Sequence, residues 1–166
     1  MVTEPKLEYR QAQPYAAIRT AVPIPFGKYM QPLWNEVSAW LMEQGSTAPG
    51  PAIIRYLTTD MSKKLDIDVG FIVDKAVHGN QRISAGILPA GRYATLLYTG
   101  PYRGKGIYNA TVALLEWVEK NAILWSTTSK NGVEWWDARS EFYLTDPARE
   151  ANTKKYRTEL AFLVKS

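Results

Sequence analysis

Glu141 is the residue of this sequence whose type and position most favour chemistry. It lies within Ser140-Glu-Phe-Tyr-Leu-Thr145, a stretch that predicts a β-strand with Glu141 and Tyr143 on one face. Glutamate is uncommon in strands and is costly to bury without a partner. On the floor of an aromatic groove this carboxylate would attract cations and would have a raised pKa. At the surface it would instead pair with a neighbouring Arg or Lys, and the residues alone leave both interpretations open.

Aromatic side chains are the second group of candidates. The chain holds six Trp, ten Tyr and four Phe, together 12% of its residues. Such side chains fill either a core or a ligand cavity, and composition does not decide between the two. The candidates for a cavity wall are Trp34, Tyr102, Tyr108, Trp136 and Tyr143. Trp34 also lies on an apolar helical stripe, so core packing is its alternative role.

Several kinds of site are excluded by composition. With no cysteine and one histidine, His78, the chain has no disulfide, zinc–thiolate or multi-histidine site, and we expect no metal and no cofactor. The net charge of +4 is scattered without a basic block, which is a weak signal for nucleic-acid binding. We find neither an apolar run near 18 residues nor a secretory signal, so we expect no membrane contact and a cytoplasmic location.

The elements that would position these residues occur in two copies. Four collinear stretches match: 15–23 with 93–101, 37–41 with 114–118, 55–58 with 142–145, and 66–73 with 157–164. We therefore predict one domain over residues 1–166, built from pseudo-repeats at about 6–77 and 80–166. In this alignment Ile54 is the counterpart of Glu141. The fold thus accepts an apolar residue where the second copy carries a carboxylate.

Each copy is predicted to be a strand–helix–strand–strand module. The expected strands are 15–22, 52–58 and 67–73 in the first copy and 91–99, 140–145 and 158–164 in the second. One helix should start near residues 29–31, because Pro32 is tolerated only in a first turn. Side by side, the tandem modules would form an α+β fold, one antiparallel sheet with two helices on one face. A groove is then expected at the pseudo-two-fold axis.

The copies differ in the connection between the helix and the next strand. This connection is short in the first copy, about 46–51, and long in the second, 122–139. The longer one contains Trp125, Trp135 and Trp136 around a polar stretch, Ser126-Thr-Thr-Ser-Lys-Asn-Gly132. It is either a small hairpin that packs its own tryptophans or a lid over the groove.

Several short motifs, in this order and spacing, carry a family resemblance over nearly the whole chain. They are Leu88-Pro-Ala-Gly-Arg-Tyr93, Thr99-Gly-Pro-Tyr102, Trp117, Glu141-Phe-Tyr143 with Asp146-Pro147, and Thr158-Glu159-Leu160. The chain resembles the GyrI-like small-molecule-binding domains, which are similar to the effector-binding domains of multidrug-sensing transcription regulators. That family has the duplicated strand–helix–strand–strand fold.

The resemblance implies a groove that binds bulky, lipophilic, often cationic aromatic small molecules. The family's buried glutamate would be Glu141, and its aromatic walls would include some of Trp34, Tyr102, Tyr108, Trp136 and Tyr143. Only about 14 residues precede the first expected strand, with no helix-turn-helix, so we expect a stand-alone form without direct DNA binding.

Two alternatives also follow from the resemblance. Some stand-alone GyrI-like proteins look like hydrolases that open the cyclopropane of DNA-alkylating natural products. In that case Glu141 would be catalytic and would position a water, with Tyr108 or Tyr143 assisting. Other relatives act on DNA gyrase, so the second alternative is a gyrase-inhibitor-like module with a protein partner.

Overall fold

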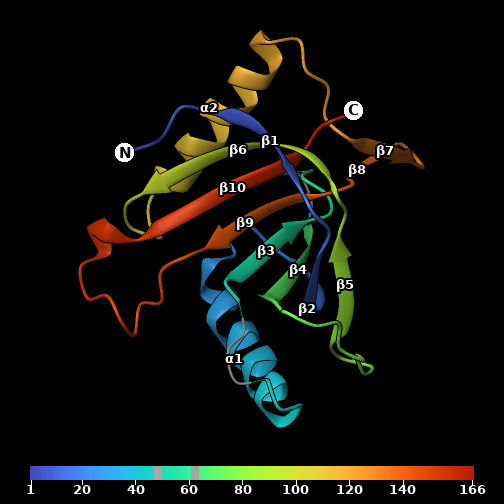
Figure 1. Cartoon of the computed structure of the whole chain (residues 1–166), viewed down its shortest axis with the longest axis vertical. Coiled ribbons are helices and arrows are strands. Elements are labelled where there is room, and N and C mark those ends of the chain that lie inside the picture. Colours follow the sequence, from blue (N-terminus) through green and yellow to red (C-terminus); the bar gives the residue numbers. More distant parts are fainter. Residues whose placement is uncertain (47–49, 61–63) are drawn as a thin grey trace.

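The chain folds around one long antiparallel sheet, as seen in a computed structural model (Figure 1). The structure describes residues 1–46, 50–60 and 64–166, so part of the expected 46–51 connection lies outside the described residues. The helices are α1 (Gly27–Glu43) and α2 (Gly106–Lys120), with a 3₁₀ turn at Thr153–Lys155. The strands are β1 (Lys6–Arg10), β2 (Gln13–Val22), β3 (Ala52–Tyr56), β4 (Leu65–Ile72), β5 (Ser84–Leu88), β6 (Gly91–Thr99), β7 (Thr127–Lys130), β8 (Val133–Trp136), β9 (Arg139–Tyr143) and β10 (Arg157–Leu163).

The predicted duplicated architecture is confirmed. Within the described residues, eight strands form one sheet in the order β1-β6-β10-β9-β3-β4-β2-β5, and β7 pairs separately with β8. The first module is β2-α1-β3-β4 and the second is β6-α2-β9-β10. The modules meet where β3 pairs with β9, in a register that sets Ile54 beside Glu141. The two counterparts in the repeat are thus neighbours at the pseudo-two-fold axis.

The outermost strands were not expected from the sequence. β1 precedes the first module but pairs with β6 of the second, whereas β5 precedes the second module but pairs with β2 of the first. Their sequences, Lys6-Leu-Glu-Tyr-Arg10 and Ser84-Ala-Gly-Ile-Leu88, hold few β-branched residues, which is why their composition gave no strand signal. Each module therefore takes its edge strand from the segment that precedes the other module.

Both helices pack on one face of the sheet. A continuous row of cross-strand partners crosses this face. Its members are Ile18, Val69, Ile54, Glu141, Leu160 and Leu96. Helix α1 covers the Val69 and Ile54 end, and α2 covers the Leu160 and Leu96 end. Glu141 is the one polar member of the row, and it lies between the areas that the two helices cover.

Helix α1 starts at Gly27, earlier than the expected 29–31, so Pro32 lies in its second turn. Pro32 is exposed, which leaves the carbonyl that its missing N–H would have bonded free to contact water. Gly45 follows the helix with a φ of 87°, a left-handed conformation that favours glycine and ends the helix. No helix in the described part of the chain is long and apolar enough to cross a membrane.

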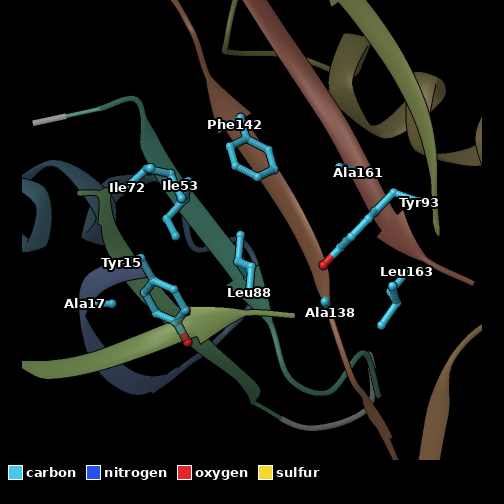
Figure 2. Close-up of a cluster of buried hydrophobic side chains, with 10 residues drawn as sticks. All are labelled: Tyr15, Ala17, Ile53, Ile72, Leu88, Tyr93, Ala138, Phe142, Ala161 and Leu163. Carbon is cyan, nitrogen blue, oxygen red and sulfur yellow. The ribbon is translucent and has the colours of Figure 1, made fainter. Parts of the chain in front are cut away.

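The other face of the sheet curls around a second core. Tyr15 of β2 and Tyr93 of β6 belong to one buried cluster, although their strands lie near opposite ends of the sheet (Figure 2). Leu88, Phe142 and Leu163 complete the contact between the two ends. A flat sheet would hold these strands far apart, so the cluster requires the sheet to bend. The helices therefore lie on the convex face, and Glu141 with them.

Candidate functional site

The carboxylate of Glu141 is held by two tyrosine hydroxyls on the helix-covered face of the sheet. Tyr56 donates to Oε1 of Glu141 at 2.9 Å, and Tyr143 donates to the same oxygen at 2.5 Å. The Glu141 residue is only 7% exposed, and its neighbours in the sheet are the fully buried Ile54 and Leu160. No hydrogen bond between described residues reaches Oε2. The arrangement fixes one carboxylate oxygen and leaves the other available.

Burial shifts the ionisation of all three groups. Removal from water raises the pKa of Glu141, while the hydroxyls of Tyr143 and Tyr56 and the charge of Arg139 oppose that rise. Burial and the adjacent carboxylate raise the pKa of Tyr56 and of Tyr143 well above the ordinary tyrosine value. Both tyrosines therefore stay protonated and act as hydrogen-bond donors at physiological pH.

Three of the expected wall residues come together at the Tyr143 end of this site. The ring of Tyr143 lies 5.1 Å from that of Trp34 and 5.2 Å from that of Tyr102, both edge to face. Trp34 reaches across from α1 and donates to the carbonyl of Ile53 at 3.2 Å. Tyr102 is anchored by donating to the carbonyl of Thr145 at 2.7 Å. The rings thus pack edge to face, and hydrogen bonds from their polar ends hold them in place.

Arg139 occupies the opposite end, two residues before Glu141 on the same face of β9. Its guanidinium lies 4.6 Å from the ring centroid of Trp136, 4.6 Å from that of Phe162 and 5.8 Å from that of Tyr56. The Nε atom is buried, and among the described residues it has no hydrogen-bond partner. Burial lowers the pKa of Arg139, and the neighbouring Tyr56 and Glu141 oppose that shift.

The long connection forms the β7–β8 hairpin, whose base packs against the body of the protein. Trp136 donates to Oγ1 of Thr59 at 3.1 Å, and its ring lies 5.4 Å from that of Trp125. Both tryptophan rings also contact Phe162. These contacts favour the hairpin interpretation over a free lid. They also make Trp136 a neighbour of Arg139 rather than of Glu141.

Tyr108 lies apart from this group. It is 63% exposed on α2, and no ring contact between described residues includes it.

Three residues of the site were not predicted from the sequence, namely Tyr56, Arg139 and Phe162. The repeat contained a signal for the first, because Tyr56 is the counterpart of Tyr143. No such signal marked Arg139 or Phe162.

Two surface hollows in the described part of the chain lie elsewhere. One, of about 340 Å³, is lined by residues around Gly45 and Val73, and the other, of about 290 Å³, lies beside Trp40 and Arg82. Neither touches Glu141. In the described part of the chain, no group of three or more His, Cys, Asp or Glu side chains is arranged to hold a metal ion.

The geometry can be set against known proteins. A family model described as a GyrI-like small molecule binding domain matches residues 3–165. A comparison with curated proteins gives no match.

Solved structures share the fold. The chain superimposes on EcmrR in an EcmrR–DNA complex with a TM-score of 0.77 and 20% identity, covering 98% of this chain and 57% of that one. With the EcmrR C-terminal domain alone the TM-score is 0.74 at 18% identity, and coverage is 98% of both chains.

SAV2435 bound to tetraphenylphosphonium gives a TM-score of 0.62 at 12% identity, covering 99% of this chain and 95% of that one. A hydrolase from Listeria innocua gives 0.59 at 14% identity, with 98% and 92% covered. At such identities the likeness concerns the fold.

Proposed function

Because the chain belongs to the family of GyrI-like small molecule binding domains, we propose that it binds bulky, lipophilic aromatic compounds, with a cationic or donor group turned towards Glu141. The proposed site is the part of the sheet face around Glu141, at the pseudo-two-fold axis between the areas that α1 and α2 cover. The observation that carries the proposal is the buried carboxylate of Glu141, held through one oxygen by Tyr56 and Tyr143.

The placement of Glu141 makes little sense as a stabilising feature. A carboxylate between two fully buried aliphatic side chains is less stable than an apolar residue would be, as its counterpart Ile54 illustrates. Opposite a ligand cation the same group becomes favourable, since two unit charges 4 Å apart attract by about 4 kcal/mol at an effective dielectric constant of 20. The free oxygen Oε2 supplies the contact.

The aromatic walls supply affinity without strict shape selection. Trp34, Tyr102 and Tyr143 meet edge to face, and a flat guest that separates these rings would replace their mutual contacts with stacking on the guest. Aromatic faces also attract cations by about 0.5–2 kcal/mol each. Such contacts tolerate many ring systems, so broad specificity follows from the chemistry. That SAV2435 is seen with tetraphenylphosphonium, a lipophilic aromatic cation, is consistent with this chemistry.

Binding is favoured over hydrolysis by the packing around Glu141. A general base needs a water beside it in addition to room for the bound compound, so hydrolysis requires more space than binding alone. Here the carboxylate is 7% exposed and lies among tyrosine and aliphatic side chains. A likeness in fold to a hydrolase at 14% identity concerns the fold and adds no argument for hydrolysis.

The test is a calorimetric titration with the cationic ethyl ester of rhodamine B. We expect saturable one-to-one binding to the wild-type protein. Glu141→Gln should weaken that binding about tenfold or more, the equivalent of 1.4 kcal/mol, because it removes the charge and preserves the shape. Glu134→Gln is the matched control, since Glu134 is an exposed carboxylate on the hairpin. Absence of saturable binding to the wild-type protein would contradict the proposed function.

A further inference from the structure

The guanidinium of Arg139 is a mostly enclosed cation without a polar partner. Within the described part of the chain, no hydrogen bond and no ion pair includes it, and its Nε atom is fully buried. Its immediate neighbours are the faces of Trp136 and Phe162, each 4.6 Å from the guanidinium carbon. Cation–π attraction offsets part of the lost hydration, but it leaves the buried Nε–H donor without an acceptor among the described residues.

Arg139 lies on the same face of the sheet as Glu141. The two residues are separated by one position on β9, so strand alternation sets them on one face about 7 Å apart. No ion pair joins them. Glu141 is instead held by Tyr56 and Tyr143, and Arg139 is held by the rings of Trp136 and Phe162. This face of the sheet therefore carries one negative and one positive group, each fixed by its own neighbours.

We propose that Arg139 is a specificity-determining residue that binds a carboxylate or similar anionic group of the ligand, so that the site prefers dipolar aromatic compounds over purely cationic ones. This inference rests on the proposed function and adds the charge pattern of the ligand to it. An anionic group at Arg139 would accept the charge-assisted hydrogen bonds that the guanidinium does not form in the described residues. The cationic end of the same ligand would then lie against Glu141.

The alternative role for Arg139 is an internal counter-charge that merely moderates Glu141. The two roles predict different selectivity between a carboxylate and its ester. A ligand-binding arginine favours a guest with a free carboxylate, whereas an internal counter-charge gives that carboxylate no advantage over its ester. A pair of probes that differ only in this group therefore separates them.

Rhodamine B and its ethyl ester are such a pair, since the first carries a free carboxylate and the second does not. We expect wild-type protein to bind rhodamine B about tenfold tighter in calorimetric titrations, the effect of one charge-assisted contact. Arg139→Gln should remove this preference by weakening rhodamine B alone. Arg139→Lys keeps the charge and should retain part of the preference. Arg82→Gln is the matched control, because Arg82 is an exposed arginine that pairs with Glu36.

Each outcome has one meaning. Equal or tighter binding of the ester by the wild type overturns the role of Arg139 and leaves the proposed function intact. A preference that survives Arg139→Gln overturns it as well. If the wild-type protein binds neither dye, the proposed function itself is rejected, and this inference is rejected with it. Because the comparison of the two dyes on the wild-type protein needs no variant, the proposal can be overturned even if the Arg139→Gln protein misfolds.

Discussion

Glu141 links function and stability at the scale of single residues. Burial raises the pKa of its carboxyl group in the folded protein. A group whose pKa is raised on folding supports the folded state below its unfolded pKa, and this support is lost as the pH rises through the folded pKa. Ionised Glu141 is therefore a local source of instability in the unliganded protein at neutral pH.

We predict that Glu141→Gln stabilises the unliganded protein relative to the wild type, and that this gain grows from pH 4 to pH 8. Glutamine keeps the shape and the acceptor for Tyr56 and Tyr143 but has no charge to bury. Urea unfolding at the two pH values measures the difference. The control is Glu36→Gln. A hydrogen bond from Arg82 lowers the pKa of Glu36, so the stability change of this variant should depend on pH in the opposite direction. A gain that shrinks with pH would contradict the role of burial.

The sequence predicted the carboxylate and the aromatic wall of this site but not its arginine. Glu141 was identifiable because an internal repeat supplies its own comparison, in which Ile54 shows that an apolar residue fits. Trp34, Tyr102 and Tyr143 were expected near it and do meet. Arg139 was not identifiable, because its importance depends on having no partner. Only three-dimensional contacts, here with Trp136 and Phe162, show that a charged side chain is enclosed and unpaired.

At the scale of elements, the close approach of the paired strands β2 and β4 depends on a glycine. Gly70 of β4 pairs with Ala17 of β2. A Cβ atom at Gly70 would lie 2.6 Å from the Cα of Ala17 and would overlap the carbonyl oxygen of Ala16. Both of those contacts are backbone, so no side-chain rotation relieves them.

Gly70→Ala should therefore destabilise the protein by about 3 kcal/mol or more, at the upper end for overpacking. Gly27→Ala is the control. A Cβ atom at Gly27, in the first turn of α1, meets no atom within 4 Å, and the change should be neutral or stabilising by roughly 0.5–1 kcal/mol. Chemical denaturation measures both. A Gly70→Ala protein as stable as Gly27→Ala would show that the two strands can separate without cost.

The two arms of the β7–β8 hairpin are joined at their base by the carboxylate of Asp137. Ser126 donates to its Oδ2 at 2.6 Å, and Thr128 donates to its Oδ1 at 3.0 Å, so one carboxylate joins both sides of the hairpin base. Hydrogen bonds to charged groups contribute about 1.5–3 kcal/mol. We predict that Asp137→Ala speeds amide hydrogen exchange in the hairpin about tenfold.

The matched control for Asp137 is Glu134→Ala. Glu134 accepts one bond, from Thr127 at 2.7 Å, on the exposed part of the hairpin. That variant should change exchange little, because an exposed bond competes with water. If both variants behaved alike, the base of the hairpin would be held by Trp125 and Trp136 rather than by Asp137. The sequence predicted a hairpin or a lid here, and the packing of its tryptophans against Phe162 and Thr59 could not be inferred from local pattern.

At the scale of the whole molecule, the two repeats are connected by reciprocal strand exchange. The segment before the first module supplies β1 to the second, and the segment before the second supplies β5 to the first (Figure 1). The repeat pattern revealed the modules because it aligns equivalent segments of the two copies. It could not reveal the exchange, because β1 and β5 pair across the repeat boundary and long-range pairing leaves no mark in local composition.

Strand exchange makes independent unfolding of the modules unfavourable. Loss of the second module alone would leave β3 without β9, and it would expose Tyr15 and Ile53 of the core shared by both ends of the sheet. We therefore predict one cooperative transition, with tryptophan fluorescence and far-ultraviolet circular dichroism giving the same urea midpoint and slope. The most protected amides of β4 and of β10 should exchange with one common free energy of opening, because each requires global unfolding. Two separated midpoints, or β4 amides that exchange while β10 stays protected, would mean that the modules are stable alone and that the exchanged strands are only appended to them.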